Sequence, residues 1–275
     1  MPVSAQSRRV LFVHAHPDDE ALYTGASIAQ CIADGFQVMV VTCTRGEEGD
    51  ILDPSLSQSA SAKNDNLGQY RSEELAAALQ VLGVRRHLFL GAPTRKFRDS
   101  GMTGRISNQH PHAFTKADVM ERANLLAQVI LDFDPQIVIT YDPSGGYGHP
   151  DHIQTNLITT KALAIVAEST QLGKSGDQAP ILMWCMIPDS QALESLNLTK
   201  NLTSVKELLD GALESALEVM EQTVAVPVAE FISEKVAALR CHKSQMGPKL
   251  FEGLSDQEIL SLIPTIELLI PSQKL

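Results

Sequence analysis

Two short segments rich in histidine and aspartate carry the residue types best suited to chemistry. They are residues 16–20 (His-Pro-Asp-Asp-Glu) and residues 148–152 (Gly-His-Pro-Asp-His). Each follows an apolar run that predicts a buried strand, at residues 10–13 and 137–140, and each precedes a helical pattern. Because open α/β sheets bind their ligands at the carboxyl ends of the strands, the two segments predict a single metal site assembled from both.

The residue types in these segments favour hydrolysis of a carbonyl compound. His16 and Asp19 lie three residues apart, a spacing that can turn both side chains to one face at the start of a helix. With His152 they would offer a catalytic divalent metal two imidazole nitrogens and one carboxylate oxygen, with a position left for water. Such an ion lowers the pKa of bound water to about 7. Asp18 would then be free to accept a proton from that water, and His149 would face the same space and stabilise an oxyanion.

The other histidines have weaker links to a site. His14 lies within the first predicted strand and is expected to face a packed layer. His110 and His112 lie in a loop, where we expect them to be solvated. His87 and His242 have no clustered partner in the sequence, so no functional role is predicted for them.

The composition limits the class of protein. The chain has 275 residues, 44% hydrophobic and 20% charged, which suits an ordinary soluble enzyme with one large α/β domain, or with one domain and a small appendage. Its formal net charge of −11 argues against a nucleic-acid partner, which would require a basic face. The sequence has neither a signal-peptide pattern nor a run of about 18 apolar residues, so we expect a cytoplasmic protein with no membrane partner. The four widely spaced cysteines are expected to be reduced thiols.

Strand and helix patterns alternate along most of the chain. Besides the two strands named above, strands are predicted at residues 38–42, 88–90 and 181–187, and helices at residues 21–34, 71–82, 116–133 and 150–169. This alternation predicts an α/β fold, a mostly parallel Rossmann-like sheet flanked by helices. Long polar loops at residues 43–66 and 91–115 follow strands. They should therefore lie over the same sheet edge as the two His/Asp segments and shape a pocket there.

The carboxy-terminal part of the chain has a looser pattern. We expect residues 1–187 to form a Rossmann-like hydrolase core, and residues 188–275 to form a smaller region packed on that core. Within this region, helices are predicted at residues 203–220 and 229–241, with a candidate strand at residues 223–228 between them.

Taken together, the two His/Asp segments resemble the signature of the LmbE/PIG-L family of metal-dependent de-N-acetylases. Within the family, the resemblance is strongest to the mycothiol-pathway branch, which acts on N-acetylglucosaminyl-inositol. The segments that support this narrower resemblance are residues 42–49 (TCTRGEEG), 70–75 (YRSEEL), 98–102 (RDSGM) and 141–147 (YDPSGGY). The resemblance covers residues 9–168 well and the remainder loosely.

The resemblance implies a role for each matched residue. The implied metal ligands are His16, Asp19 and His152. The implied catalytic groups are the general base Asp18, the oxyanion-stabilising His149 and the assisting Tyr147. The implied substrate contacts are Arg71, Asp99 and Asp50, the last at a position where a relative carries the longer glutamate.

The implied reaction is hydrolysis of the acetamide of N-acetylglucosaminyl-inositol, a small-molecule amino sugar, to glucosaminyl-inositol and acetate in mycothiol biosynthesis. The implied cofactor is one divalent ion, Zn²⁺, although two histidines and one carboxylate suit Fe²⁺ equally well.

The alternative functions are those of a mycothiol S-conjugate amidase and of a de-N-acetylase of another N-acetyl sugar. A nucleotide-binding Rossmann protein would need Gly-x-Gly-x-x-Gly after the first strand, where residues 16–20 stand instead. A sugar-binding module without catalysis would require neither Asp18 nor His149.

Overall fold

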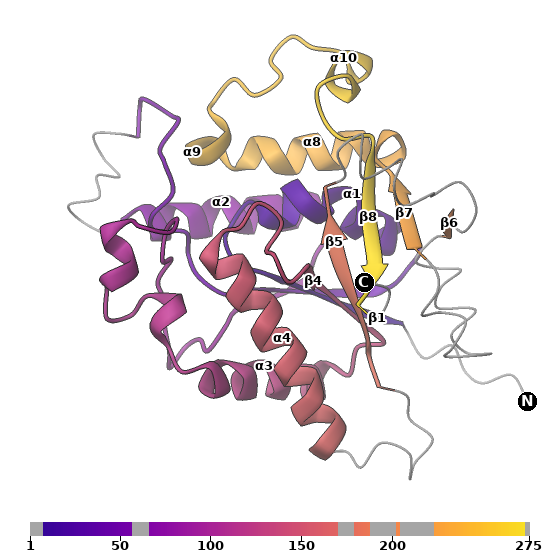
Figure 1. The fold of residues 1–275 in the computed structure, drawn as a ribbon. Coiled ribbons are helices and arrows are strands. Elements are labelled where there is room, and N and C mark those ends of the chain that lie inside the picture. Colours follow the sequence, from indigo (N-terminus) through magenta and orange to yellow (C-terminus); the bar gives the residue numbers. More distant parts are fainter. Residues whose placement is uncertain (1–7, 57–65, 170–178, 188–201, 204–222, 273–275) are drawn as a thin grey trace, which may run out of the picture.

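The computed structural model of this chain describes residues 8–56, 66–169, 179–187, 202–203 and 223–272 (Figure 1). A single mixed sheet runs through the molecule in the strand order β3-β2-β1-β4-β5-β8-β7-β6. Helices cover both faces of the sheet, so the predicted α/β class is confirmed. No helix in the described part of the chain is long and apolar enough to cross a membrane.

The part of the sheet that positions the site is parallel. Its strands are β1 (Arg9–His14), β2 (Gln37–Thr42), β3 (Arg86–Phe89), β4 (Ile137–Tyr141) and β5 (Ile181–Met186). Val10 in β1 pairs with Val38 on one side and with Ile137 on the other. Every residue of β4 is buried, as expected for a central strand that is covered on both faces.

The carboxy-terminal residues extend the same sheet. β8 (Ile266–Pro271) runs antiparallel to β5 and to β7 (Thr223–Pro227), and β7 pairs with the short β6 (Leu202–Thr203). The predicted strand at residues 223–228 is thus confirmed as β7, whereas the sequence analysis did not predict β8. Of the helix predicted at residues 203–220, residue 203 lies in β6, and the others lie outside the described residues. The division of the chain at residue 187 stays a prediction.

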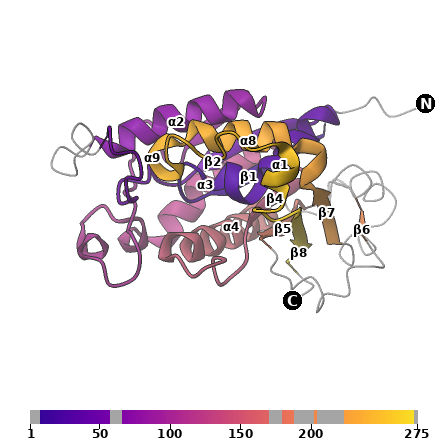
Figure 2. The same ribbon diagram turned by 90° about the horizontal axis from the view of Figure 1, so that it is seen from above.

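Two groups of helices sandwich the sheet (Figures 1 and 2). α1 (Asp19–Ala33), α2 (Leu67–Val81) and α8 (Ile232–Cys241) share one apolar core cluster with the sheet. α3 (Val119–Phe133) and α4 (Pro150–Ser169) share the other. The shorter helical elements are η2 (Ile106–Gln109), η3 (Phe114–Lys116), η4 (Val228–Phe231), α9 (Lys243–Met246) and α10 (Asp256–Leu260).

Several predicted boundaries differ from those observed. α2 begins at Leu67, four residues before the predicted start, and residues 229–241 begin with η4 and continue as α8. α3 begins at Val119 and not at residue 116, because Asp118 caps it by accepting a hydrogen bond from the Glu121 amide at 2.8 Å. These differences fall at helix starts, where capping and tertiary contacts outweigh hydrophobic periodicity.

An ion pair from the carboxy-terminal region bridges a kink in α1 at Thr24 (φ −137°, ψ 17°). The ammonium group of Lys235 donates to the carbonyls of residues 21–22, at 2.8 and 2.7 Å. The carboxylate of Glu267 accepts from the backbone amides of residues 26–27, at 2.9 and 2.7 Å, and lies 2.6 Å from Lys235. A broken helix leaves carbonyls before the break and amides after it without partners. α8 and β8 supply those partners, and they thereby fix the helix that begins at Asp19.

Candidate metal centre and active site

The two His/Asp segments lie side by side at the carboxyl edge of the sheet. Residues 16–20 connect β1 to α1, and residues 148–152 connect β4 to α4. The ring of His16 lies 4.5 Å from that of His149 and 5.2 Å from that of His152, centroid to centroid. β1 and β4 are neighbouring parallel strands, and for that reason side chains 136 positions apart in the chain face a common space.

The three residues predicted as metal ligands form a compact triangle. His16 Nδ1 lies 3.3 Å from Asp19 Oδ2 and 3.3 Å from His152 Nε2, and His152 Nε2 lies 3.4 Å from Asp19 Oδ1. All three side chains are buried. Ligand atoms about 2.0–2.1 Å from a tetrahedral ion stand roughly 3.3–3.4 Å from one another. The spacing and the donor set therefore fit a divalent metal.

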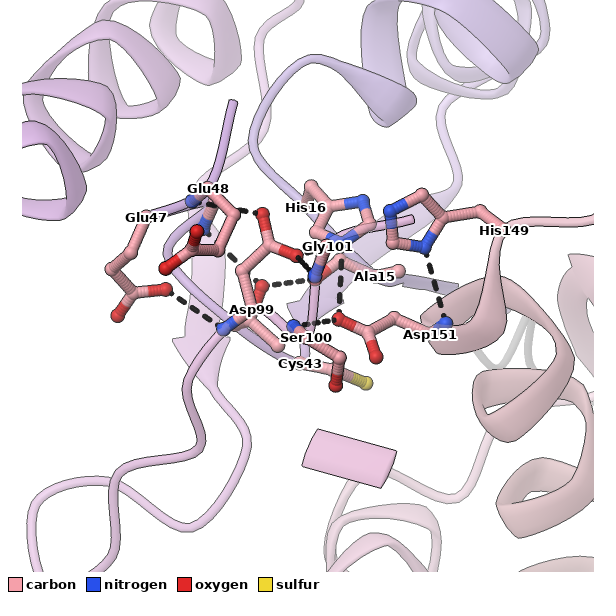
Figure 3. Close-up of polar contacts among 12 residues, drawn as sticks. Ala15, His16, Cys43, Glu47, Glu48, Asp99, Ser100, Gly101, His149 and Asp151 are labelled. Atoms are coloured by element: carbon pink, nitrogen blue, oxygen red, sulfur yellow. Dashed lines mark hydrogen bonds and ion pairs between the residues drawn. The ribbon is translucent and has the colours of Figure 1, made fainter. Parts of the chain in front are cut away.

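Neighbouring side chains orient these three groups. The Tyr141 hydroxyl donates to Asp19 Oδ2 at 2.7 Å, and the Tyr141 ring stacks on His152 at a centroid distance of 4.0 Å. Asp151 Oδ2 lies 3.3 Å from His16 Nε2, so His16 can donate to Asp151 while its Nδ1 faces Asp19 and His152 (Figure 3). A carboxylate behind a ligating histidine fixes the tautomer and the ring orientation. The sequence analysis did not predict this orienting role for Tyr141 or Asp151.

Charges in this cluster shift the ionisation of its members in opposite directions. Burial alone would lower the pKa of His16, but the carboxylates of Asp99, Asp151 and Asp19 raise it well above its ordinary value. Burial alone would raise the pKa of Asp19, but His152 and His16 hold it well below its ordinary value. This lowered pKa favours the ionised carboxylate, which is the form that can bind a metal.

Two other groups of side chains also bring ligand atoms within 4.8 Å of one another. They are His16, His149 and His152, and His16, Asp99 and Asp151. In the second group, Asp99 Oδ1 and Asp151 Oδ2 already accept hydrogen bonds from the backbone amides of Gly101 and Ser100, both at 2.8 Å (Figure 3). The site is therefore rich in donor atoms on both sides of the His16 ring.

Asp18, the predicted general base, adjoins the triangle in an uncommon backbone conformation. Its φ of +107° lies in a region that residues other than glycine rarely adopt. Its carboxylate accepts a hydrogen bond from Arg71 Nη2 at 3.0 Å. Burial raises the pKa of Asp18 to about 6, although Arg71 opposes this shift. A carboxyl group with a pKa in this range can both accept and return a proton near neutral pH.

His149 and Tyr147 face the triangle from the second segment. His149 Nδ1 accepts a hydrogen bond from the Asp151 amide at 3.1 Å, so a neutral ring carries its proton on Nε2. Burial and the nearby His16 lower the pKa of His149 to about 3. A neutral imidazole of this kind can donate a hydrogen bond to a developing oxyanion. The Tyr147 side chain is 62% exposed, its ring lies 6.0 Å from that of His149, and partial burial raises its pKa.

The predicted substrate contact Arg71 is a buried residue that also holds the first segment together. Its guanidinium donates to the carbonyl of Gly46 at 2.7 Å and to the carbonyl of Pro17, in addition to the contact with Asp18. A sequence pattern could not show that this charge pairs with the predicted base.

The other two predicted substrate contacts occupy different depths. Asp99 is buried, and its carboxylate accepts from the amides of Gly101 at 2.8 Å and Glu48 at 3.2 Å. The Asp50 side chain is 76% exposed and lies 3.3 Å from Arg105 across the mouth of the site. Asp50 is thus the more accessible of the two acids.

A pocket with a cavity volume of about 220 Å³ lies over the site. Eight of the nine residues predicted from the sequence line it, and the ninth, His152, is fully buried. The polar loops at residues 43–66 and 91–115, which were predicted to shape the pocket, also contribute residues to its lining. The lining residues that were not predicted are Leu22, Tyr23, Glu48, Gly49, Gly101, Met102, Arg105 and Gln245.

His242 corrects the sequence analysis, which gave it no partner. It is fully buried, and its Nε2 lies 2.6 Å from the carboxylate of Glu20 in the first segment. The two residues are 222 positions apart, so local clustering could not reveal their contact. His14, in contrast, is buried against Thr24 as expected, with Nε2 2.9 Å from Oγ1.

Comparison with known proteins places the chain among sugar deacetylases. The model of the PIG-L family, described as GlcNAc-PI de-N-acetylase, matches residues 11–163, a span that holds both His/Asp segments. The chain belongs to this family.

Curated relatives extend the PIG-L similarity over most of the chain. The chain is 41% identical over 251 residues to the 1D-myo-inositol 2-acetamido-2-deoxy-alpha-D-glucopyranoside deacetylase of Thermomonospora curvata, covering 89% of this chain and 82% of that protein. It is 43% identical over 239 residues to the protein of the same name from Acidothermus cellulolyticus, covering 87% and 80%.

Solved structures show the same fold at lower sequence identity. The N,N'-diacetylchitobiose deacetylase from Pyrococcus horikoshii matches with a TM-score of 0.59 at 18% identity, covering 98% of this chain and 85% of that one. A 4-carboxy-2-hydroxymuconate hydratase from Pseudomonas putida matches with a TM-score of 0.57 at 18% identity, covering 96% and 95%. At these identities the likeness concerns the fold alone, and the hydratase shows that this fold hosts more than one chemistry.

Proposed function

We propose that this PIG-L family member hydrolyses the acetamide of 1D-myo-inositol 2-acetamido-2-deoxy-alpha-D-glucopyranoside to glucosaminyl-inositol and acetate, the mycothiol-pathway reaction. The observation that carries the proposal is the triangle of two imidazoles and one carboxylate, with Asp18 and His149 lining the pocket above it. Curated relatives at about 40% identity over most of the chain bear the name of this deacetylase.

His16, Asp19 and His152 would hold one divalent ion, Zn²⁺ in our proposal. A divalent ion there supplies a Lewis acid that polarises the acetamide carbonyl and lowers the pKa of a nearby water molecule. The burial of all three side chains favours this role, because a cation offers a shared partner to buried donor atoms that already face one another. The same donors suit Fe²⁺, so metal analysis must decide the identity of the ion.

Asp18 is the proposed general base. Its carboxylate accepts the proton of the attacking water and can later return it to the departing amine nitrogen of the sugar. Arg71 holds the carboxylate by an ion pair of 3.0 Å and so limits the directions in which it can turn. An ionised carboxylate fixed at the wall of the pocket is the form that this step needs.

His149 and Tyr147 are the proposed donors to the carbonyl oxygen. As the water attacks, negative charge develops on that oxygen, and donors already in place stabilise it without reorganising. The protonated Nε2 that the Asp151 amide imposes on His149 is one such donor. The exposed hydroxyl of Tyr147 is the second, and its place at the pocket lining lets it approach after the sugar has entered.

We also propose that the substrate hydroxyls contact Arg71, Asp99 and Asp50, with the inositol ring toward Asp50 and Arg105. A site that hydrogen-bonds hydroxyl groups discriminates strongly against analogues that lack them, because its own polar groups are then left unpaired. N-acetylglucosamine without inositol should therefore be a much poorer substrate.

The test is kcat/KM measured with metal-loaded protein for three compounds, with acetate release as the readout. N-acetylglucosaminyl-inositol should give the highest value, free N-acetylglucosamine a much lower one, and a mycothiol S-conjugate the lowest. A highest value for the conjugate would establish an amidase instead. Release from none of the three would refute the assignment of the substrate. Metal content of protein purified without chelator, measured in parallel, identifies the ion.

A further inference from the structure

A buried contact between a histidine and a carboxylate joins the first His/Asp segment to the carboxy-terminal part of the chain. Glu20 is the second residue of α1, and His242 lies between α8 and α9. Both side chains are completely buried, with His242 Nε2 2.6 Å from Glu20 Oε1. Among the described residues, His242 is the one basic side chain within 4.0 Å of the Glu20 carboxylate. Neither residue is a proposed metal ligand, and neither lines the pocket.

The second oxygen of Glu20 contacts the backbone of the proposed general base. Glu20 Oε2 accepts a hydrogen bond from the Asp18 amide at 3.0 Å. On the other side of the same peptide unit, Arg71 donates to the carbonyl of Pro17. Both polar atoms of the peptide bond between residues 17 and 18 are therefore held, one by Arg71 and the other by Glu20.

This peptide needs to be held because Asp18 has a φ of +107°. A residue with a Cβ atom keeps such a conformation only where surrounding contacts impose it. Without the hydrogen bond to its amide, Asp18 would relax toward negative φ, and its carboxylate would turn away from the position it now occupies beside Arg71.

The orientation of Glu20 depends in turn on His242. A carboxylate with no exposure needs a partner for each oxygen, since burial of an unpaired charge is strongly unfavourable. The Asp18 amide serves one oxygen and His242 the other. Removing His242 would leave Glu20 with a single partner and with space into which it could turn.

We propose that Glu20 and His242 are positioning residues that hold Asp18 in the conformation required for the reaction. Through them, the segment that contains α8 and α9 completes a site whose reacting groups all come from residues before 153. This inference rests on the proposed function in one respect, that Asp18 is the general base.

The first experiment compares three variants by kcat, KM, metal content and thermal unfolding. His242→Ala should lower kcat about 10–100-fold, the range typical of residues that orient the groups of a metal site through hydrogen bonds. KM and metal content should be unchanged. His242→Gln keeps an N–H donor for Glu20 and should restore most of the kcat. Val236→Ala is the matched control: it removes two buried methyl groups from α8, so it should lower the unfolding temperature without changing kcat per folded molecule.

The second experiment asks whether His242 acts through Asp18. Asp18→Asn and the double variant Asp18→Asn/His242→Ala should have the same kcat, because a misplaced base costs nothing further once the base has been removed. Additive losses would overturn the positioning role, and so would a normal kcat or a loss of metal in His242→Ala. Near-normal turnover in Asp18→Asn would instead refute the base assignment, which is the proposed function and not this inference.

Two variants of Glu20 guard against failure of His242→Ala to fold. Glu20→Ala leaves His242 in place, removes the acceptor for the Asp18 amide directly, and should lower kcat as much as His242→Ala does. Glu20→Gln retains an oxygen that can accept from that amide and should keep most of the activity. Equal kcat for Glu20→Ala and the parent protein would overturn the proposal.

Discussion

Residues 145–152 and residues 14–20 both lead from a strand into a helix at the site, but different causes fix their backbones. In the segment after β4, Gly145, Gly146 and Gly148 have φ values of +71°, +68° and +86°, which glycine adopts without strain. In the segment after β1, the left-handed residue is Asp18, with a φ of +107°. The first conformation follows from local residue types, whereas the second is imposed.

The contacts around the two segments show how the second conformation is maintained. Asp18 is held by Arg71 from α2 and, through Glu20, by His242 at the end of α8. His152, in contrast, follows Pro150 at the start of α4 and stacks on Tyr141 of the preceding strand. Where the chemistry requires a carboxylate at a position that glycine would otherwise occupy, distant parts of the chain must supply the constraint.

The largest effect is expected to be the same for both segments, because each gives a ligand to the same proposed ion. His16→Ala and His152→Ala should each lose metal and almost all activity, because the proposed reaction depends on the bound ion. Metal content per chain and acetate release measure the two effects, and circular dichroism checks that the sheet remains folded. Stoichiometric metal with normal turnover in either variant would contradict the ligand assignment.

A somewhat smaller effect should separate the catalytic groups of the two segments. Asp18→Asn removes proton acceptance and should lower kcat by about 10²–10⁴-fold. His149→Ala removes one donor to the oxyanion and should lower kcat by about 10²–10³-fold. In both variants KM and metal content should change little, because the lost contributions act mainly in the transition state. A rise in KM alone would show that the residue serves binding and not the chemical step.

The difference in backbone strain can be measured directly as stability. Asp18→Gly and Asp18→Asn both remove the carboxylate, but only the glycine relieves the positive φ, so it should be the more stable by about 1 kcal/mol. Gly145→Ala should have the opposite effect, since its Cβ would lie 2.8 Å from the Ile153 amide at a φ of +71°. Urea unfolding of the metal-free proteins gives these differences. Equal stability of the two Asp18 variants would show that this residue is not strained.

The smallest predicted effect is a contrast in pH dependence between two histidines. Burial and His16 lower the pKa of His149 to about 3. Below about pH 6.5 the unfolded chain therefore binds a proton at this residue that the folded protein does not bind, and the free energy of unfolding falls. Burial alone would lower the pKa of His242, but Glu20 raises it above its ordinary value, so its contribution is present at low pH and is lost as the pH rises through that pKa.

The measurement is the free energy of unfolding of the metal-free proteins at pH 5 and pH 7. Relative to the parent protein, His149→Gln should gain about 1–2 kcal/mol between pH 7 and pH 5. His242→Gln should instead lose more stability at pH 5 than at pH 7. His112→Gln serves as the control, because His112 is exposed and lies in neither of the two segments. The same sign of change in both variants would contradict the contrast.

Much of the site could be predicted because its donors occur in clusters next to strands. The buried runs that form β1 and β4, and Pro150 at the start of α4, are local signals, and parallel neighbours deliver their ends to one edge. Eight of nine predicted residues consequently line the pocket, and the fold class is confirmed. β8 escaped prediction because Glu267 interrupts its apolar run, and the burial of Glu267 is favourable only through its contacts with Lys235 and with the backbone amides of residues 26–27.

The sequence by itself determined which donor atoms are available and where the chain can turn, because residue types and φ preferences act over a few neighbouring positions. The tertiary structure alone decided which charges are paired. Arg71 meets Asp18, Glu20 meets His242, and Lys235 meets Glu267. Such pairings depend on burial beside a partner tens or hundreds of residues away, and a buried charge gains its role only when folding brings that partner within reach.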